Sequence, residues 1–197
     1  MPAADGTGTF SAYRLPRGRH GLAPELVAEN QRWRILGGAA EALEGLGYAR
    51  LTSSAIAHRA GVSTSTFYRH FDNVGDCLLA AYEMAMECIL DVVADACDPD
   101  FDRPRRVRQA IAAALRFLAT EPALARLLGT EAPAGVPEIA AARERLVDRL
   151  AVLLDDGGNG AERRRVAGAL ALVSDRIASA QPVEDRGFAA ELAAVFA

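Results

Sequence analysis

The stretch AGVSTSTFYRHF, residues 60–71, decides how the front part of this chain folds. Gly61 permits a sharp turn, because glycine adopts backbone angles that other residues avoid. Ser63 can cap the helix that follows, and Phe67 and Phe71, four residues apart, direct their rings to one side of it. The stretch therefore predicts a turn that leads into a short amphipathic helix.

Another short helix is predicted immediately before this turn. Thr52 can cap its first turn, and Ile56 and Ala60, four residues apart, form its inner face. Two short helices joined by a turn that contains glycine form a helix-turn-helix.

The second helix of this motif has an outward face suited to a DNA groove. With both phenylalanines turned inward, Ser65 and Arg69 point away, and Thr66 and Tyr68 lie on the two flanks. Hydroxyls can bond base edges or phosphates, and arginine can bond guanine through two hydrogen bonds. Thr52 places a hydroxyl at a helix N-terminus, where phosphates bind readily. From the spacing alone, DNA binding and an ordinary solvated helix face both remain open.

Charge is divided unevenly along the 197 residues, whose formal net charge is −4. Residues 1–70 hold eight arginines and five acidic residues, a balance of +3, whereas residues 71–197 have a balance of −7. Residues 1–21 form a predicted flexible arm with Arg17 and Arg19, which is either a disordered tail or an arm for the minor groove of DNA. A basic front segment thus precedes an acidic body.

The rest of the chain is predicted to be helical. One helix begins at Pro24 and is stopped by GLGY at residues 45–48. From about Asn73 the predicted helices are longer, and prolines and glycine-rich segments separate them. Because alanine and leucine are abundant, β-branched and aromatic residues are few, and none of the segments alternates like a strand, we expect an all-α protein. Neither a membrane-spanning run of about 18–20 apolar residues nor a secretory signal is visible, so we expect a cytoplasmic protein.

Enzyme chemistry finds little support in the sequence. The motifs GxSxG, HExxH, the P-loop and paired zinc cysteines are all missing, and every histidine lies in the first 70 residues. Cys77, Cys88 and Cys97 fall in one predicted helix, where burial as small apolar residues is favoured over a redox or intersubunit role. We therefore expect no enzyme, no cofactor and no metal site.

A longer segment supports a family resemblance. The residues ILGGAAEALEGLGYARLTSSAIAHRAGVSTSTFYRHFDNVGDCLLAAYE resemble the DNA-binding region of the TetR family of bacterial transcriptional regulators. The resemblance covers roughly residues 25–83 and rests on Gly-Tyr before a threonine, on AIAHRAGVS, and on the aromatic residues around Arg-His. It implies a three-helix helix-turn-helix domain at residues 22–72 and a helical effector-binding and dimerisation domain at residues 73–197.

The expected DNA contacts lie on the second helix of the motif, at the two helix caps or in the arm. They are Thr52, Ser63, Thr64, Ser65, Thr66, Tyr68, Arg69, His70, Arg17 and Arg19. For His70 the resemblance, rather than the helical geometry, suggests a phosphate contact. Val74 stands near a position where the family commonly has a phosphate-binding lysine, so that contact is expected to be missing.

The resemblance also implies how such a protein works. We expect a homodimer, paired through its last two helices, that acts as a repressor on a palindromic operator and is released by a small molecule. Effector binding would shift the helix that follows the DNA-reading helix. The alternative is a degenerate family member that senses a ligand or binds a protein partner without binding DNA.

Two features of the body are candidates for effector binding. Met84, Met86, Phe117 and Leu118 either line an apolar pocket or belong to the ordinary core. Acidic residues also recur every four positions from Glu83 to Asp95. These form either a solvated stripe or an acidic lining that selects a cationic effector.

Overall fold

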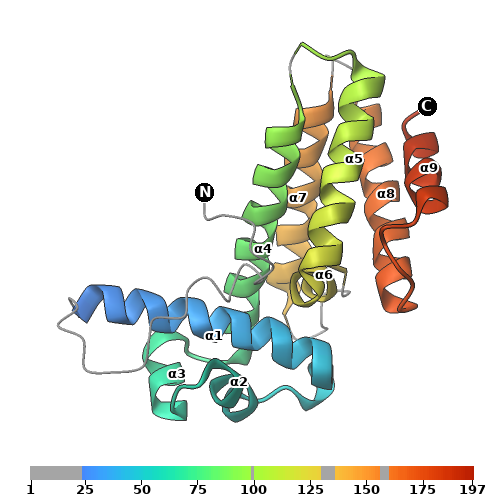
Figure 1. The fold of residues 1–197 in the computed structure, drawn as a ribbon. Coiled ribbons are helices and arrows are strands. Elements are labelled where there is room, and N and C mark those ends of the chain that lie inside the picture. The colour runs from blue at the N-terminus through green and yellow to red at the C-terminus, as the bar shows by residue number, and fades with distance from the viewer. Residues whose placement is uncertain (1–23, 99, 130–135, 156–159) are drawn as a thin grey trace. The chain divides into compact units, whose positions relative to one another are not determined.

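The computed structural model describes residues 24–98, 100–129, 136–155 and 160–197. The expected arm at residues 1–21, including Arg17 and Arg19, lies outside them. Within the described residues all regular structure is helical, which confirms the all-α prediction (Figure 1). The elements are α1 (Pro24–Leu46), η2 (Tyr48–Arg50), α2 (Ser53–Ala60), α3 (Thr64–His70), α4 (Val74–Ala96), α5 (Arg103–Thr120), α6 (Pro122–Gly129), α7 (Pro137–Leu154), α8 (Ala161–Ala178) and α9 (Arg186–Val195).

The chain divides into two compact units, and the boundary between them lies after Ala81, inside α4. The sequence placed it at the start of this helix, between residues 72 and 73. The first turns of α4 associate more closely with α1–α3 than with the later helices, and they bury Cys77 and Leu78. Each unit is therefore a packed body, and α4 contributes residues to both.

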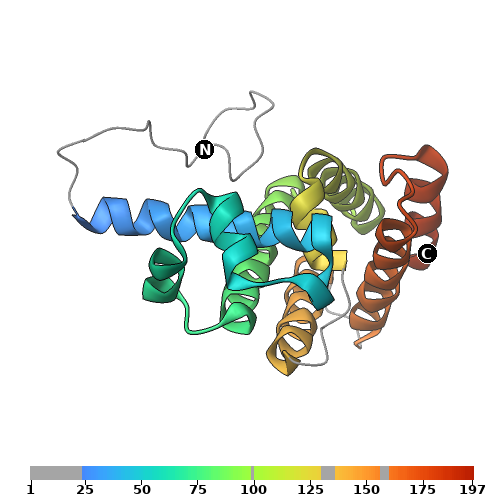
Figure 2. The same ribbon diagram turned by 90° about the horizontal axis from the view of Figure 1, so that it is seen from below.

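The first unit is built on a close approach of α1 and α2. Both α2 and α3 lie on the same side of α1 (Figures 1 and 2). A Cβ atom on Gly38 of α1 would lie 2.8 Å from the Ala60 backbone nitrogen and 2.9 Å from the Ile56 carbonyl oxygen, so only glycine fits there without a shift. The side chains of Ile35, Ile56 and Phe67 are fully buried between the helices. Burying each such side chain stabilises the fold by about 1.5–3 kcal/mol.

An arginine closes the C-terminal end of α2. One terminal nitrogen of the Arg34 guanidinium donates to the carbonyl oxygens of Ala60 and Gly61, at 2.6 and 2.7 Å. These carbonyls have no partner within the helix, and the negative end of the helix dipole favours a cation there. Arg34 therefore fixes the end of α2 against α1.

The second unit contains the longer helices. Leu115 of α5 packs with Phe188 and Leu192 of α9, and half-buried side chains of α8 cover this cluster. Arg103 of α5 pairs with the buried carboxylate of Glu162 on α8, and it also donates to the Phe196 carbonyl oxygen at 3.0 Å. One guanidinium thus joins α5, α8 and the residue that follows α9.

The cysteines lie as small packed side chains. Cys77 is buried, Cys88 and Cys97 are half-buried, and all three carry free thiols. Burial raises the pKa of the Cys77 thiol to about 12. Among the described helices, none is long and apolar enough to cross a lipid bilayer.

Candidate nucleic-acid interface and ligand pocket

The turn between α2 and α3 has the geometry that the sequence predicted. The Thr52 hydroxyl oxygen accepts a hydrogen bond from the Ala55 backbone N–H at 3.1 Å and so caps α2. Gly61 ends α2 in the left-handed conformation, with φ 63° and ψ 37°. A side chain is strained there, so glycine at this position is what permits the sharp turn.

A cluster of hydroxyl groups begins α3. Ser63 caps the helix by accepting from the Thr66 backbone N–H at 3.0 Å. Its oxygen also lies 2.8 Å from the hydroxyls of both Ser65 and Thr66. Because these groups already bond one another, the start of α3 is ordered before any ligand binds.

Thr66 differs from expectation. The sequence placed it on an exposed flank of α3, but its side chain is only 7% exposed. Its hydroxyl contacts Ser63 and accepts a hydrogen bond from the Arg69 guanidinium at 3.0 Å. The prediction of an outward Thr66 was therefore wrong, because the Ser63 and Arg69 side chains enclose its hydroxyl. Thr66 positions Arg69 rather than facing solvent.

The remaining side chains predicted for the outward face do lie there. Thr64, Ser65 and Arg69 are exposed, and Tyr68 is 55% exposed. The Tyr68 phenol oxygen lies 3.0 Å from the Ser53 hydroxyl at the start of α2, which fixes the direction of the ring. Tyr68 therefore joins the two helices of the motif while its ring remains open to a ligand.

His70 lies at the edge of this face. It is half-buried, and its Nε2 lies 3.4 Å from the side-chain oxygen of Gln31. Burial lowers its pKa, and the nearby positive charges of Arg69 and Arg32 lower it further. His70 is therefore neutral at neutral pH, and its charge would contribute little to phosphate binding there.

The structure shows which arginines form contacts within the fold and which keep exposed side chains, a distinction that the sequence did not predict. Arg59 donates to the Glu41 carbonyl oxygen at 2.8 Å and so links α2 to α1, as Arg34 does from the other side. Arg32 and Arg69 keep exposed side chains. The only sequence feature that could have indicated the contact of Arg59 with α1 was Gly45, against which the Arg59 guanidinium lies.

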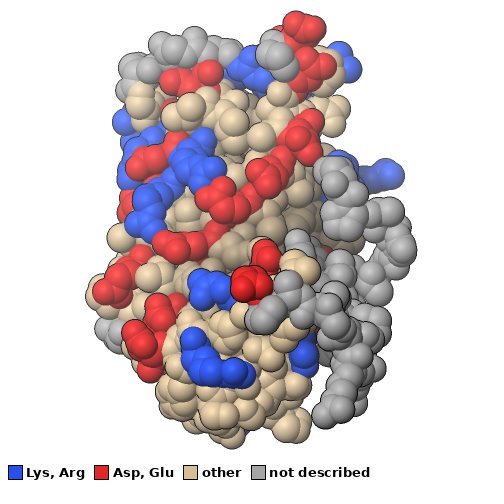
Figure 3. All heavy atoms as spheres, turned by 90° about the vertical axis from the view of Figure 1, so that its left-hand side faces the viewer, with Lys and Arg blue, Asp and Glu red and all other residues tan. Residues whose placement is uncertain are grey.

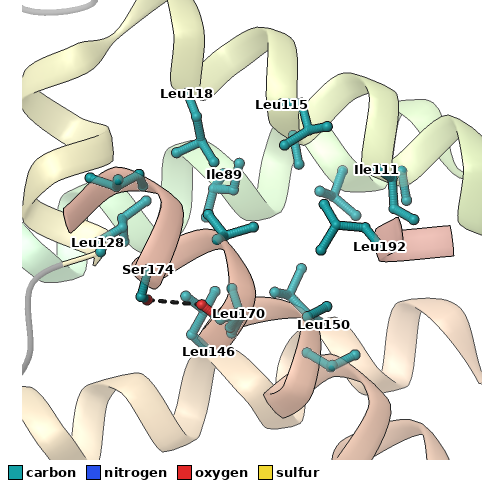
Figure 4. A pocket seen from close by; sticks show the side chains of 18 of the residues that line it. Ile89, Ile111, Leu115, Leu118, Leu128, Leu146, Leu150, Leu170, Ser174 and Leu192 are labelled. Carbon is teal, nitrogen blue, oxygen red and sulfur yellow. Dashed lines mark hydrogen bonds between the residues drawn. The ribbon is translucent and has the colours of Figure 1, made fainter. Parts of the chain in front are cut away.

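An apolar pocket of about 100 Å³ lies within the second unit. Its walls come from α4 to α9, and most are leucine, isoleucine, valine and alanine side chains (Figure 4). Leu118, one of the predicted effector contacts, lines it together with Ile89, Leu146 and Leu192. The pocket is the natural candidate for an effector site, since small-molecule sites are concave and mostly apolar.

The other three predicted effector contacts lie elsewhere. Met84 and Met86 line a separate surface hollow, and Phe117 is half-buried but lines neither hollow. The residue type and the helical spacing of Met84 and Met86 indicated that these side chains are buried, but could not predict which cavity they line.

The acidic stripe of α4 is a solvated surface. Glu83 and Glu87 pair with Arg145 and Arg149 of α7, with N–O distances of 3.0 Å in each pair. Acidic and basic side chains accordingly lie side by side on this face of the second unit (Figure 3). Exposed pairs of this kind stabilise a protein by less than about 1 kcal/mol each. The apolar pocket has no acidic residue in its walls, so the stripe does not supply an acidic lining there.

The described residues contain no set of ligands for a metal ion. Within the part of the chain that the structure describes, no three histidine, cysteine or acidic side chains come together as metal ligands.

A comparison with protein families found a match over the helix-turn-helix. Residues 35–81 match the family model described as bacterial regulatory proteins, tetR family. These residues include the end of α1, the whole of α2 and α3, and the start of α4.

Two curated relatives and one solved structure extend the comparison. The nucleoid occlusion factor SlmA of Vibrio cholerae is 30% identical over 127 residues, which are 64% of this chain and 62% of that protein. The chain thus spans less than two thirds of that relative. The transcriptional activator FasR of Mycolicibacterium smegmatis is 28% identical over 173 residues, covering 85% and 78% of the two chains. The structure of FadR from Bacillus subtilis in complex with stearoyl-CoA shares the fold, with TM-score 0.66, 18% identity, and 82% and 94% of the two chains covered.

Proposed function

Because this chain belongs to the TetR family of bacterial transcriptional regulators, we propose that it is a repressor that a small molecule releases from a palindromic operator. The observation that carries this proposal is the outward face of α3, where Ser65, Tyr68 and Arg69 are exposed on a capped helix. The family consists of regulators rather than enzymes, in agreement with the missing catalytic motifs.

The outward face of α3 matches the chemistry of a major groove. One terminal nitrogen of the Arg69 guanidinium donates to the Thr66 hydroxyl, and the other N–H groups of the guanidinium can bond guanine. The Tyr68 ring is stiff and ends in a hydroxyl suited to a phosphate oxygen. At the start of α2, Thr52 is exposed and lies beside the free N–H groups of a helix N-terminus. Base contacts then come from α3, and phosphate contacts from both helices.

A homodimer would present two such faces to one duplex. Half-sites in palindromic operators lie about 34 Å apart, one turn of the double helix. The best pairing surface is α8 with α9, because α8 carries small side chains at Ala167, Ala171 and Ala178, of which the last two are exposed. Small residues allow helices from two subunits to approach closely.

Effector binding would act through α4. Ile89 and Val93 of α4 line the apolar pocket, and only three residues separate the start of this helix from the end of α3. The Asn73 side chain caps α4 by accepting from the Asp76 backbone N–H at 2.9 Å, so the α3–α4 connection is short and ordered. A ligand that favours one position of α4 would change the affinity for DNA, typically by 1–3 kcal/mol of coupling. FadR from Bacillus subtilis, which has a similar fold, forms a complex with stearoyl-CoA, a molecule that carries a long hydrocarbon chain.

A mobility-shift assay with the upstream region of the chain's own gene tests the proposal. We expect a palindromic segment to bind specifically, with an affinity that falls steeply as salt increases. Tyr68→Ala should weaken binding and Tyr68→Phe should weaken it less, while Val152→Ala, an exposed position on α7, should leave it unchanged. Sedimentation should show the same dimer for all variants. Equal affinity for the operator and for random duplexes would refute the proposal.

The valine at position 74 offers a gain-of-function test. Val74 is half-buried at the first position of α4, where the family commonly has a lysine. Val74→Lys should tighten binding and steepen the dependence of log K on log salt by about 0.9, the value for one added phosphate contact. An unchanged salt slope would show that this position does not face the DNA backbone.

A further inference from the structure

The apolar pocket of the second unit has a polar end. Of the residues that line it, only Tyr82, Arg143 and Ser174 carry polar side-chain groups, and Arg143 is the only one that is charged. Tyr82 lies on α4, Arg143 on α7 and Ser174 on α8. Three helices thus bring their polar groups to a cavity that is otherwise lined by hydrocarbon.

Arg143 has no acidic partner among the residues that the structure describes. Its guanidinium donates to the Ser174 hydroxyl at 2.9 Å. That hydroxyl in turn donates to the Leu170 carbonyl oxygen at 2.8 Å, the bond drawn as a dashed line in Figure 4. The serine hydrogen is therefore used, and Ser174 holds the arginine in place as an acceptor. Arg145 and Arg149, on the same helix, do have carboxylate partners. Arg143 alone of these three faces the pocket, and it leaves a positive charge there.

Tyr82 brings an unused donor to the same place. The residue is 1% exposed, and its hydroxyl has no hydrogen-bond partner among the described residues. Leaving such a group unsatisfied costs about 1–3 kcal/mol, so a partner for it would stabilise the protein. Burial raises the pKa of this phenol to about 12, and the charge of Arg143 acts in the opposite direction. The hydroxyl is therefore protonated at neutral pH and ready to donate.

We propose that this pocket binds a carboxylate with a hydrocarbon body, the carboxylate accepting from Arg143 and Tyr82 and the body lying among the leucines. This assignment rests on the proposed function, since it names the chemical class of the effector. A cation would find no acidic side chain in the walls. An uncharged ligand would leave the arginine without a counter-ion, whereas a single carboxylate has the two oxygens that a guanidinium and a phenol require.

The volume of the pocket implies that its walls move. A cavity of about 150 Å³ accepts benzene, and this one measures about 100 Å³. A hydrocarbon body of eight or more carbons therefore has to displace side chains or helices around it. Binding of such a ligand is coupled to a change in the helices that form the walls, α4 included.

Calorimetry on the full chain without DNA tests the head group, with decanoate and decan-1-ol as probes of the same chain length. We expect decanoate to bind the wild-type protein at least tenfold more tightly than decan-1-ol. Arg143→Gln should abolish this preference while decan-1-ol still binds. Arg145→Gln is the matched control, because Arg145 lies on the same helix but pairs with Glu83 at the surface, and it should keep the preference. Equal binding of the two probes to wild type, no binding of either, or an unchanged preference in Arg143→Gln would overturn the assignment.

Tyr82→Phe gives a test that does not depend on the folding of Arg143→Gln. Removing an unpartnered hydroxyl should leave the melting temperature of the unliganded protein unchanged or higher, yet decanoate affinity should fall several-fold. A lower melting temperature or an unchanged decanoate affinity would contradict the role given to Tyr82. Because these measurements contain no DNA, they can fail while the mobility shift succeeds. A decanoate preference without any specific DNA binding would refute the proposed function alone.

Discussion

Replacing Gly38 by alanine should unfold the helix-turn-helix unit more easily, although alanine is the better helix former. Gly38 lies inside α1, where its missing side chain lets α2 approach. A Cβ atom there would lie 2.8 Å from the Ala60 nitrogen, 2.9 Å from the Ile56 oxygen and 3.1 Å from the Ala60 Cβ. Two of these atoms belong to the α2 backbone, so the whole helix has to move rather than one flexible side chain.

Two opposing terms set the magnitude. Alanine stabilises a helix interior by about 1 kcal/mol relative to glycine. Overpacking of a tight contact costs about 1–3 kcal/mol, and contacts with backbone atoms belong at the upper end of that range. We therefore expect a net loss of about 2 kcal/mol for Gly38→Ala. For a domain of about 60–100 residues each kcal/mol lowers the melting temperature by about 4–8 °C.

The fluorescence of Trp33 provides the assay. It is the single tryptophan of the chain and lies on α1, so its urea transition reports on the first unit. Gly168→Ala in α8 is the matched control, because a Cβ there would meet only Val195 Cγ1, at 3.7 Å. Followed by circular dichroism, this variant should gain up to about 1 kcal/mol.

The two substitutions should therefore have opposite signs. DNA binding should also weaken in Gly38→Ala, because a displaced α2 carries Thr52 away from its position. A Trp33 transition at the same or higher urea concentration in Gly38→Ala would refute the close-approach argument. So would a destabilised Gly168→Ala, since steric conflict would then not distinguish the two sites.

Three further predictions concern buried or half-buried groups. Arg103→Met leaves the 6% exposed carboxylate of Glu162 with Arg165, at 3.5 Å, as its remaining basic partner. This change should cost about 3 kcal/mol in thermal unfolding, more than Glu162→Gln, and a loss below about 1 kcal/mol would contradict the importance of the Arg103 pair. Burial lowers the pKa of His70 from its ordinary value of 6.5, so as pH falls the unfolded chain binds a proton at this residue before the folded chain does. The contribution of His70 to the free energy of unfolding is therefore complete above about pH 6.5 and decreases as the pH falls below that value. His70→Asn should accordingly lose less stability than wild type between about pH 7.5 and 5.5, and parallel losses would exclude His70 as the cause. With its pKa near 12, Cys77 should not react with a thiol reagent at about pH 8 until the protein unfolds, and immediate reaction of all three thiols would disprove its burial.

The helical elements could be predicted from sequence because their signals are local. Thr52 and Ser63 cap their helices as expected, and Gly61 has the left-handed conformation that the turn requires. Each of these contacts joins residues only a few positions apart. Caps and turns of this kind form in much the same way in any surrounding structure.

The candidate site could be predicted only in part. Ser65, Tyr68 and Arg69 are exposed as their helical positions imply, but Thr66 is buried because the Ser63 and Arg69 side chains enclose its hydroxyl. Of the predicted effector contacts, only Leu118 lines the apolar pocket. Helical periodicity gives the face on which a side chain lies, but not the neighbours that face meets.

The sequence by itself determined an all-helical chain with a capped, glycine-turned helix-turn-helix and a basic front segment. Only the tertiary structure decided which arginines are available, because an arginine looks the same in sequence whatever it binds. Arg34 donates to carbonyls 26 and 27 residues away, whereas Arg143 donates to Ser174, 31 residues away, and its charge remains available to the pocket. Such partners are set by how helices pack across long separations in the chain, and no local pattern of residue types encodes that geometry.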